Sequence, residues 1–567
     1  MKLSGAQAIV KLLEEEGVKS LFGYPGGSVI PLYDALYDSK KIKNVLTAHE
    51  QGAIHAADGY ARATGKTGVC IATSGPGATN IVTGIATAYL DSVPLVAITG
   101  QVQVKYLGRD SFQEIDIVGV TIPITKYNAI VRKPEELLPT LRRAFKIAKE
   151  GRPGPVLIDV PGSIQTSEIT WTEPEKESVD NNYEAECKKK NAQEKELLTA
   201  ASVVLANAER PVLLVGGGAI LGDAKEEIRE FAEITGIPVI HTLMGHGVFP
   251  GSNSQCLGMT GMHGHIAANR AIASADVMIV AGSRLSERVT GDRDRYVGKK
   301  TIIQIDIDPS ELDKNVVSSL PLVGCLKETL AKLNKKVSKL SIKPWWDTIR
   351  AWENTEVEPL KTNNKLTAPW LLEELNQIYK GENPYYITDV GQNQMWTAQH
   401  LKIDEPRHFI TSGGCGTMGF GFPGALGAKK GLMDEGINNP VVSISGDGGF
   451  KMTGMELYTA VRENLPLVSI VINNSCLGMV RQWQEVFYEA RYSATLLTEF
   501  DFIGFAKSCG ADGVKVKTQK EFKEALNKAK KLNKPFLIEA VIEQADLVIP
   551  MVAPGAVIDE FVDPDKK

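Results

Sequence analysis

The sequence predicts an α/β fold with three doubly wound domains, each built on a parallel sheet. Short apolar runs rich in valine and isoleucine recur along the chain, and helix-like stretches separate them, as expected for strands buried on both faces. Several of these runs end in glycine turns, as PVLLVGGGA does from Pro211 onward. The 567 residues also require several domains, because a single core stops growing near roughly 250–300 residues.

The first block of this pattern covers residues 1–167. Its clearest apolar runs are 44–47, 69–73, 95–99 and 156–160, and the last of these lies between prolines in RPGPVLIDVP. Such alternation of strands and helices is typical of parallel sheets. Residues 168–196 are densely charged and lack apolar periodicity, so we expect a linker there.

Two further blocks repeat the alternation. Residues 197–335 form the second block, with buried strands expected in PVLLV, ADVMIVA and KTIIQID. The charged segment 336–366 is expected as a second linker. The third block, 367–550, contains the apolar run PFLIEAVI near its end, and 551–567 is a tail broken by proline and glycine.

The composition excludes several classes of protein. Hydrophobic residues make up 43% and charged residues 23% of the chain, which is ordinary for a globular protein. A net charge of −5 gives no general attraction to nucleic acid or to an anionic membrane, and no apolar run approaches the ~20 residues that span a bilayer. The acidic amphipathic start is unlike a signal or transit peptide. Seven cysteines without a C-x-x-C pair favour reduced thiols in a cytoplasmic protein.

The most informative motif is a GDG turn in the third block, followed after a second apolar run by a pair of asparagines. Asp447 and Asn474 are thus expected at the carboxyl ends of two parallel strands, where open α/β sheets bind ligands. A carboxylate, an amide oxygen and a backbone carbonyl suit Mg²⁺ or Ca²⁺ that holds a diphosphate. Gly446 and Gly448 let the backbone approach the phosphates. GDG alone is a common turn, but the asparagine pair favours the metal site.

This pattern is similar to the thiamine diphosphate (ThDP) signature of ThDP-dependent enzymes. The resemblance implies domains of the ThDP-dependent pyruvate oxidase and decarboxylase type, with a pyrimidine-binding first domain and a diphosphate-binding third domain. It implies Asp447, Asn474 and the backbone carbonyl of Cys476 as metal ligands. A nucleophilic Cys476 is disfavoured, because no paired base lies near it in sequence. The implied ThDP contacts are Pro25, Gly75, Asn80, Gln392, Asn393, Gly416, Met418, Gly446, Gly448, Gly449, Met452 and Met479.

Several of these contacts have a plainer explanation. Gly75 lies in a Gly/Pro turn that opens a helix, and the exposed N–H groups of such a turn can also bind a ligand. Met452 has the offset from Asp447 at which ThDP enzymes place the apolar wedge that bends the cofactor, although methionine is usually core filler. Met479 and Trp483 share one helix face, which is ordinarily a core stripe.

Glu50, in the segment AHEQGAIHAADGYAR, is the first catalytic candidate. A lone glutamate just after a short strand is usually a helix cap or a surface charge. ThDP enzymes, however, place such an acid beside the pyrimidine ring, and HEQGA…GYAR resembles that segment. A hydrogen bond from the carboxyl group favours the imino tautomer that removes the thiazolium proton. The resemblance therefore implies that Glu50 activates the cofactor.

Two motifs resemble the acetohydroxyacid synthase (acetolactate synthase) family. The stretch GRDSFQEID is similar to a family segment that faces the thiazolium ring, which implies Phe112 as an apolar wall and Gln113 as a contact to the reacting intermediate. The motif QWQ is similar to one whose tryptophan narrows the acceptor pocket, which implies this role for Trp483. Lys126 is a candidate for steering a substrate carboxylate or a flavin, although an isolated lysine is more often a solvated charge.

The middle block carries VGGGA, LMGHG, GMTGMHG and AGSRLSERVTGD. A GGG turn alone is a weak dinucleotide signal, but together these segments resemble the FAD-binding domain of the biosynthetic synthases. The usual R-F-D-D-R-V-T-G of the family is RLSERVTG in this chain, and Cys325 stands where an acid is usual. The implied FAD contacts are Gly217, Gly218, Thr242, Leu243, Met262, His263, Gly282, Arg284, Arg288 and Asp306.

From FGYPGG to MVAPGA, nearly the whole chain resembles the catalytic large subunit of this family. The family reaction decarboxylates pyruvate on ThDP and adds the hydroxyethyl carbanion to pyruvate or 2-ketobutyrate. The products, 2-acetolactate and 2-aceto-2-hydroxybutyrate, lead to branched-chain amino acids. FAD would be non-redox, because the net reaction transfers no electrons. The resemblance also implies a homodimer as the minimal unit, with Glu50 of one chain facing Asp447 and Asn474 of another, a tetramer as the larger alternative, and a separate small regulatory subunit.

Other ThDP enzymes remain open at this point: pyruvate oxidase, a flavin-free catabolic acetolactate synthase and a 2-hydroxyacyl lyase. The QWQ motif and the arginines Arg284 and Arg288 favour the biosynthetic branch. A glyoxylate carboligase is disfavoured, because that family lacks the acid found at Glu50. A non-catalytic paralogue is also disfavoured, because all the expected acids and amides are present.

Overall fold

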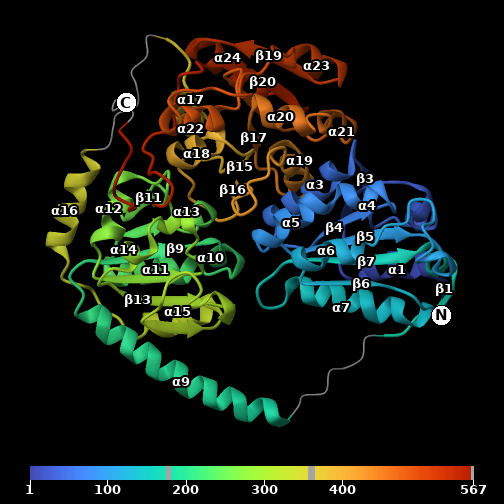
Figure 1. The fold of residues 1–567 in the computed structure, drawn as a ribbon, viewed down its shortest axis with the longest axis horizontal. Helices are drawn as coiled ribbons and strands as arrows, with labels where there is room; N and C mark the ends of the chain where they lie inside the picture. The colour runs from blue at the N-terminus through green and yellow to red at the C-terminus, as the bar shows by residue number, and fades with distance from the viewer. Residues whose placement is uncertain (174–180, 356–363, 564–567) are drawn as a thin grey trace.

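The structure is a computed structural model that describes residues 1–173, 181–355 and 364–563. Three parallel sheets of six strands form three units with helices packed on them (Figure 1). Alternate residues of one strand enter different cores, as Cys70 and Ala72 do on one face of their strand and Val69 and Ile71 on the other. The predicted class, three doubly wound α/β domains, is confirmed. No helix in these described ranges is long and apolar enough to cross a membrane.

The first sheet has the order β3-β2-β4-β5-β7-β6. Its helices include α1 (Gly5–Glu15), α2 (Ile30–Asp38), α3 (Glu50–Thr64), α5 (Val82–Leu90) and α7 (Leu137–Lys149). A short antiparallel pair, β1 (Lys2–Ser4) with β8 (Glu168–Thr170), extends this unit slightly beyond residue 167. The six strands are β2 (Ser20–Tyr24), β3 (Lys43–Leu46), β4 (Gly68–Ala72), β5 (Leu95–Gln101), β6 (Tyr127–Ile130) and β7 (Pro155–Pro161).

The third sheet has the order β16-β15-β17-β18-β20-β19. When strands are counted along the chain within each unit, this order is the same as that of the first sheet. The main helices are α17 (Ala368–Ile378), α18 (Gln392–His400), α19 (Gly421–Asp434) and α24 (Gln519–Lys530). The strands are β15 (Tyr385–Thr388), β16 (Phe409–Ile410), β17 (Val441–Gly446), β18 (Val468–Asn473), β19 (Asp512–Val516) and β20 (Phe536–Val541).

The central sheet has a different order, β11-β10-β9-β12-β13-β14. The order reverses between β9 and β12, which makes a switch point of the kind at which open α/β sheets bind ligands. Its helices include α11 (Lys225–Thr235), α12 (Ile266–Ser274) and α15 (Leu326–Asn334). The strands are β9 (Pro211–Val215), β10 (Val239–His241), β11 (Cys256–Met259), β12 (Val277–Ala281), β13 (Thr301–Asp306) and β14 (Leu320–Val323).

Both segments that we expect as linkers contain helices. Helix α9 (Asn181–Ala206) starts inside the first segment and packs Leu198 and Leu205 into the core of the central unit, along the outer edge of the molecule (Figure 1). Helix α16 (Lys343–Glu353) lies in the second and buries Trp345. The leucines of α9 that enter the core lie after residue 196, in the expected second block, whereas Trp345 lies inside the expected second linker. The linker residues 174–180 and 356–363 and the tail residues 564–567 lie outside the described residues.

The first and third units pack together through α3 and α19, which lie side by side in Figure 1. Glycines let the two backbones approach closely. A Cβ at Gly59 would collide with the carbonyl oxygen of Gly424, and a Cβ at Gly427 with that of Ala56. This packing fixes the position of the helix whose first residue is Glu50.

Candidate active site

A cavity that is partly open to solvent lies at the carboxyl ends of β15, β17 and β18. Asp447 begins helix α20 (Asp447–Thr453) directly after β17, and Asn474 follows β18. Both line the cavity, so the structure brings the two predicted metal ligands together as the strand pattern indicates. The other predicted residues that line it are Gln392, Asn393, Met418, Gly446, Gly448, Gly449, Cys476 and Met479.

Three helices begin at this cavity. They are α18, which starts at Gln392, α20, which starts at Asp447, and α22 (Gly478–Phe487). The first N–H groups of a helix have no partner within it, and the helix dipole is positive at that end. The convergence of three such ends makes the cavity a favourable site for an anion such as a diphosphate.

Asp447 is buried and has little compensation for its charge. Burial raises its pKa to about 6, although Lys451 and nearby backbone N–H groups oppose the rise. A carboxylate in this position is stabilised by a bound cation. The cation would also find the amide of Asn474 at the same cavity, and the thiol of Cys476 is disfavoured as a ligand because burial raises its pKa to about 11.

The amides of Gln392 and Asn393 differ in how they are used. Both side-chain hydrogens of Gln392 are donated to the protein, to Gln482 Oε1 at 3.0 Å and to the Asp546 carbonyl at 2.9 Å. Gln392 can therefore meet a diphosphate through its backbone N–H, while its side chain is held by protein groups. Asn393 keeps a buried Oδ1 without a partner.

A buried acid that the sequence did not single out holds the loop with Met418. Asp389 accepts hydrogen bonds from the N–H groups of Val390, Gly419 and Gly421 at 2.8 to 3.0 Å. A Cβ at Gly449 would collide with its carboxylate, which explains the glycine there. Gly416 is exposed on the same loop and Met452 is 57% exposed on α20, so neither lines the cavity within this chain.

Glu50 lies in a second group of residues, at the carboxyl edge of the first sheet. Asn80, at the end of helix α4 (Pro76–Asn80), donates to Glu50 Oε2 at 3.0 Å. Gly75 has a φ of +61°, and a Cβ there would lie 2.8 Å from Cβ of Gln113. The structure therefore brings together four predicted residues that are up to 63 positions apart, from Glu50 to Gln113.

Pro25 and Phe112 also belong to the first unit. Pro25 is exposed in the turn directly after β2, at the same carboxyl edge of the sheet as Glu50. Phe112 is 87% exposed within this chain. Within one chain the ring is open to solvent, so it cannot form the wall of a closed pocket without a second surface.

Lys126 is not part of the Glu50 group. It precedes β6 and so lies at the amino edge of the parallel sheet, whereas Glu50 and Asn80 lie at the carboxyl edge. Its amine donates to the carbonyls of Ile147 and Glu150 at the end of α7. The geometry of this chain thus gives Lys126 a helix-capping role and no contact with the predicted catalytic residues.

The carboxylate of Glu456 supports Glu50 from the third unit. It is buried on helix α21 (Glu456–Arg462) and accepts from the N–H groups of Ala48 and His49 at 3.1 Å. These residues form the turn before Glu50. The only sequence signal was an acid in an otherwise apolar stretch after the GDG motif, and its partners are some 400 residues away.

The predicted FAD residues gather at the carboxyl edge of the central sheet. Gly217 and Gly218 begin helix α10 (Gly217–Leu221) after β9, and Gly282 follows β12, on the two sides of the switch point. A Cβ at Gly218 would lie 2.8 Å from Gly282 Cα. The remaining residues follow the ends of neighbouring strands: Thr242 and Leu243 after β10, Met262 and His263 after β11, Arg284 after β12 and Asp306 at the end of β13.

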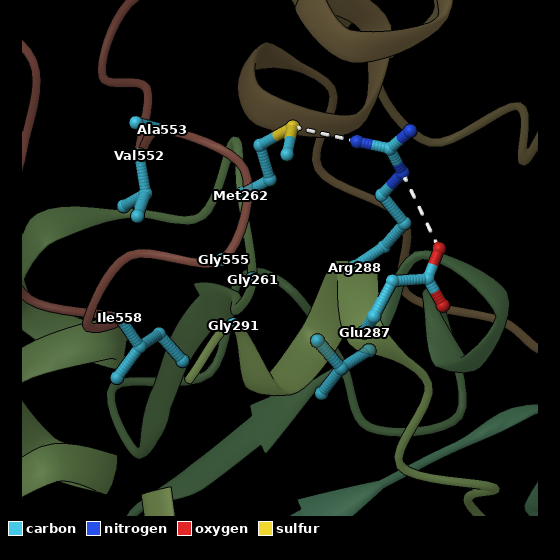
Figure 2. A pocket seen from close by; sticks show the side chains of 10 residues that line it. Gly261, Met262, Glu287, Arg288, Gly291, Val552, Ala553, Gly555 and Ile558 are labelled. Carbon is cyan, nitrogen blue, oxygen red and sulfur yellow. Dashed lines mark hydrogen bonds and ion pairs between the residues drawn. The ribbon is translucent and has the colours of Figure 1, made fainter. Parts of the chain in front are cut away.

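Arg288 connects the central unit with helix α22. Its guanidinium lies 5.5 Å from the ring centre of Trp483, within cation–π range, and its Nη1 lies 3.2 Å from the sulfur of Met262. Figure 2 shows Arg288 beside Met262 and Glu287, with the tail residues Val552 and Ala553 opposite. The predicted flavin and substrate residues therefore meet at one place.

Comparison with known proteins agrees with this architecture. Three models of thiamine pyrophosphate enzymes match the chain: the N-terminal TPP binding domain at residues 3–120, the central domain at 198–333 and the C-terminal TPP binding domain at 389–540. A probable acetolactate synthase large subunit of Methanocaldococcus jannaschii is 46% identical, with 99% of this chain and 95% of that protein covered. The chain belongs to the acetolactate synthase family. An acetolactate synthase of Mycobacterium bovis is 43% identical over 99% of this chain and 91% of its own.

A further member, the acetolactate synthase large subunit of Haemophilus influenzae, is 41% identical and is covered over 98% of its length. The predicted relationship to the acetolactate synthases and the ThDP-enzyme fold are therefore confirmed. The matched TPP binding domains coincide with the units that carry Glu50 and Asp447. The chain is a ThDP-dependent enzyme of the transferase class, and its family acts in branched-chain amino-acid synthesis.

Proposed function

We propose that the chain carries out the acetolactate synthase reaction at the cavity of Asp447 and Asn474, with Mg²⁺ and with Glu50 supplied by a second copy. The reaction decarboxylates pyruvate and joins its two-carbon remainder to pyruvate or 2-ketobutyrate. The observation that carries the proposal is the buried acid Asp447, which shares its cavity with Asn474 and the N-termini of three helices.

The cavity residues divide the binding of the diphosphate between them. Asp447, the Oδ1 of Asn474 and the backbone carbonyl of Cys476 would hold Mg²⁺, because hard cations prefer oxygen ligands. N–H groups at the starts of α18 and α20, with Gly446 and Gly448 beside them, would bind phosphate oxygens. Bound ThDP would supply a ring carbon that becomes nucleophilic toward a keto group once its proton is lost, and a ring that can accept the electron pair left by decarboxylation.

Glu50 would hold a proton on the pyrimidine side of the site, with Asn80 fixing one carboxylate oxygen and Gln113 beside it. No residue of the first unit lines the Asp447 cavity within one chain. Large apolar side chains are exposed near both groups, among them Phe112 and Met452. Exposed apolar surface of this kind marks an interface, so a homodimer that faces Glu50 of one chain with Asp447 of another completes the site. A tetramer would be a pair of such dimers.

The acceptor pocket would lie between Phe112 and Gln113 of one chain and Trp483 of the other, while Met418, Met452 and Met479 would contact ThDP beside it. Arg288 beside Trp483 gives this pocket a cation for a substrate carboxylate. Water excluded by these side chains would strengthen each electrostatic contact inside.

FAD would bind the central unit in a non-redox role. The glycines at the switch point leave room for a pyrophosphate, and Arg284 and Arg288 supply positive charge. The relatives named large subunits support a separate small regulatory subunit for this chain also. We place the enzyme in the cytoplasm.

The test is acetolactate formation from pyruvate by the purified full chain, with ThDP and Mg²⁺, in the presence and absence of FAD. Product that requires ThDP, Mg²⁺ and FAD supports the proposal in full. Product formed without FAD shifts it to the flavin-free catabolic type. Acetate or acetyl phosphate with carbon dioxide, and no acetolactate, would overturn it in favour of pyruvate oxidase.

A further inference from the structure

Three buried side-chain amides form a chain that ends at the proposed metal site. Asn474 Nδ2 donates to Gln392 Oε1 at 3.0 Å, and Gln392 Nε2 donates to Gln482 Oε1 at 3.0 Å. All three side chains are buried, Gln482 almost completely. Gln482 lies on α22 next to Trp483 and does not line the cavity.

The far end of this chain is fixed by backbone groups. The Val548 N–H donates to Gln482 Oε1 at 2.9 Å, and Gln482 Nε2 donates to the Val548 carbonyl at 3.0 Å. A backbone N–H cannot accept and a carbonyl cannot donate. Only one orientation of the Gln482 amide satisfies both bonds.

That orientation determines the next two amides in turn. Gln482 presents its oxygen, so Gln392 must turn its nitrogen toward it and its own oxygen toward Asn474. The Asp546 carbonyl takes the second hydrogen of Gln392 Nε2 and supports the same choice. Asn474 must then donate to Gln392, which leaves its Oδ1 for the cavity. No hydrogen bond among the described residues engages that oxygen.

We propose that Gln482 is a positioning residue that sets the amide orientation of Asn474, so that oxygen and not nitrogen faces the metal. This inference rests on the proposed function, because it concerns the metal site assigned there. Without Gln482, only the Asp546 carbonyl still holds the nitrogen of the Gln392 amide on that side. A half-turn of Gln392 then costs one hydrogen bond instead of two, and after it Asn474 offers its NH₂ group, which cannot bind a cation. Buried polar groups of this kind favour one arrangement only when every partner is present.

The experiment measures the dissociation constant of Mn²⁺ with ThDP present, from the electron paramagnetic resonance signal of free Mn²⁺, without reference to turnover. Gln482→Leu should weaken Mn²⁺ about tenfold, the lower end of what loss of a supporting partner does at metal sites. The matched control is Gln255→Leu, which removes an amide that donates to two carbonyls of the central unit, none of whose residues lines the cavity. It should leave Mn²⁺ affinity unchanged.

The decisive comparison uses Asn474→Asp, because a carboxylate has no wrong orientation. In that background Gln392 must rotate to donate to the new carboxylate, and Gln482 opposes the rotation. Gln482→Leu should therefore weaken Mn²⁺ binding with Asn474 and leave it unchanged or stronger with Asn474→Asp. Equal weakening in both backgrounds, or none in the native one, would overturn the inference.

A second variant keeps the test valid if Gln482→Leu does not fold. Gln482→Glu keeps the acceptor that faces Gln392, and burial favours its protonated form, whose O–H can replace the amide donor to the Val548 carbonyl. It should therefore retain Mn²⁺ within about threefold. If Gln482→Glu and Gln482→Leu lose affinity alike, the orientation argument fails. Failure of the unmodified chain to bind Mn²⁺ with ThDP would instead overturn the metal site itself, which separates the two failures.

Discussion

The first and third units share one strand order but differ in where they place their acids. Glu50 follows the second strand of the first unit, β3, whereas Asp447 and Asn474 follow the third and fourth strands of the third unit, β17 and β18. At the position that corresponds to GDG, the first unit has the uncharged turn after β4 that contains Gly75. In the proposed function, the same frame would therefore hold a proton at one edge of the first sheet and a metal ion at the matching edge of the third.

The corresponding helices of the two units, α3 and α19, pack against each other. Each follows the second strand of its own sheet, so the two units meet through the same part of the frame. The contact buries the helices that lead away from the two edges, and it leaves the edges themselves open within a single chain. This arrangement explains why a single chain carries both groups of residues and still does not bring Glu50 into the Asp447 cavity.

The largest effect is expected from substituting the acid at the carboxyl edge of either sheet, Glu50 in the first unit or Asp447 in the third. Glu50→Gln should lower turnover about 10²- to 10⁴-fold, the usual share of a positioned acid or base, while ThDP and Mg²⁺ bind as before. Asp447→Asn should abolish turnover by weakening Mg²⁺. Acetolactate assays and direct Mg²⁺ titration distinguish the two.

Mixing these two inactive variants sharpens the comparison. If a site uses Glu50 and Asp447 from different chains, a mixed dimer contains one intact site, so co-expression should restore about a quarter of the native activity for random pairing. Either variant mixed with itself is the control. Activity that stays at the level of the single variants would mean that both residues serve one site from the same chain.

The contact between the units can be broken at Gly427. A methyl group there meets the Ala56 carbonyl of α3, so Gly427→Ala should destabilise the chain by about 2 kcal/mol or more. Calorimetry should show a midpoint lowered by several degrees, and turnover should fall as Glu50 shifts. Gly162→Ala is the control, because its nearest atom, the Gln101 carbonyl oxygen, is 3.8 Å away. An unchanged midpoint for Gly427→Ala would show that α3 and α19 do not pack this closely.

The edge of the third sheet that carries Asp447 should make the stability of the chain depend on pH. Burial raises the pKa of Asp447 from 3.8 to about 6, so the folded apo chain binds this proton more tightly than the unfolded chain. Its contribution to stability is therefore lost as pH rises from about 4 to about 6. Mg²⁺ competes with the proton, so the rise in melting temperature that Mg²⁺ causes should grow up to pH 6 and then level off.

Thermal melts with and without Mg²⁺ across this pH range test the point. Asp447→Asn should abolish the pH dependence of the rise in melting temperature that Mg²⁺ causes. The buried acid Asp389 also has a pKa raised to about 6. It should titrate alike with and without Mg²⁺, because its partners are backbone N–H groups, so it should not change that rise. A Mg²⁺ effect that is constant from pH 4 to pH 8 would contradict the role of Asp447.

The sequence alone predicted those site residues whose position depends on the residues next to them along the chain. Asp447 and Asn474 each directly follow an apolar strand, so their place at one edge followed from the pattern alone. Gln113 and Trp483 needed the family resemblance, because their surroundings come from distant segments. Glu456 and Asp389 escaped notice because their partners are backbone N–H groups, which any sequence supplies. Helices α9 and α16 were not foreseen in the two expected linkers, because the density of charge in those segments carries no helical pattern that can be read from the sequence.

Substitution of Lys126 should have the smallest effect, and the position of this residue differs most clearly from that of Glu50. A residue that precedes a strand of a parallel sheet lies at the edge opposite to one that follows a strand, and its amine already caps α7 through Ile147 and Glu150. Lys126→Met should therefore change turnover less than about threefold and lower stability by about 1 kcal/mol, the usual value of such bonds. The control is Lys149→Met, at the last residue of α7, which removes only a surface ion pair with Glu16. A hundredfold loss of turnover in Lys126→Met would restore its predicted catalytic role and would mean that the amino edge of the first sheet reaches the site of another chain.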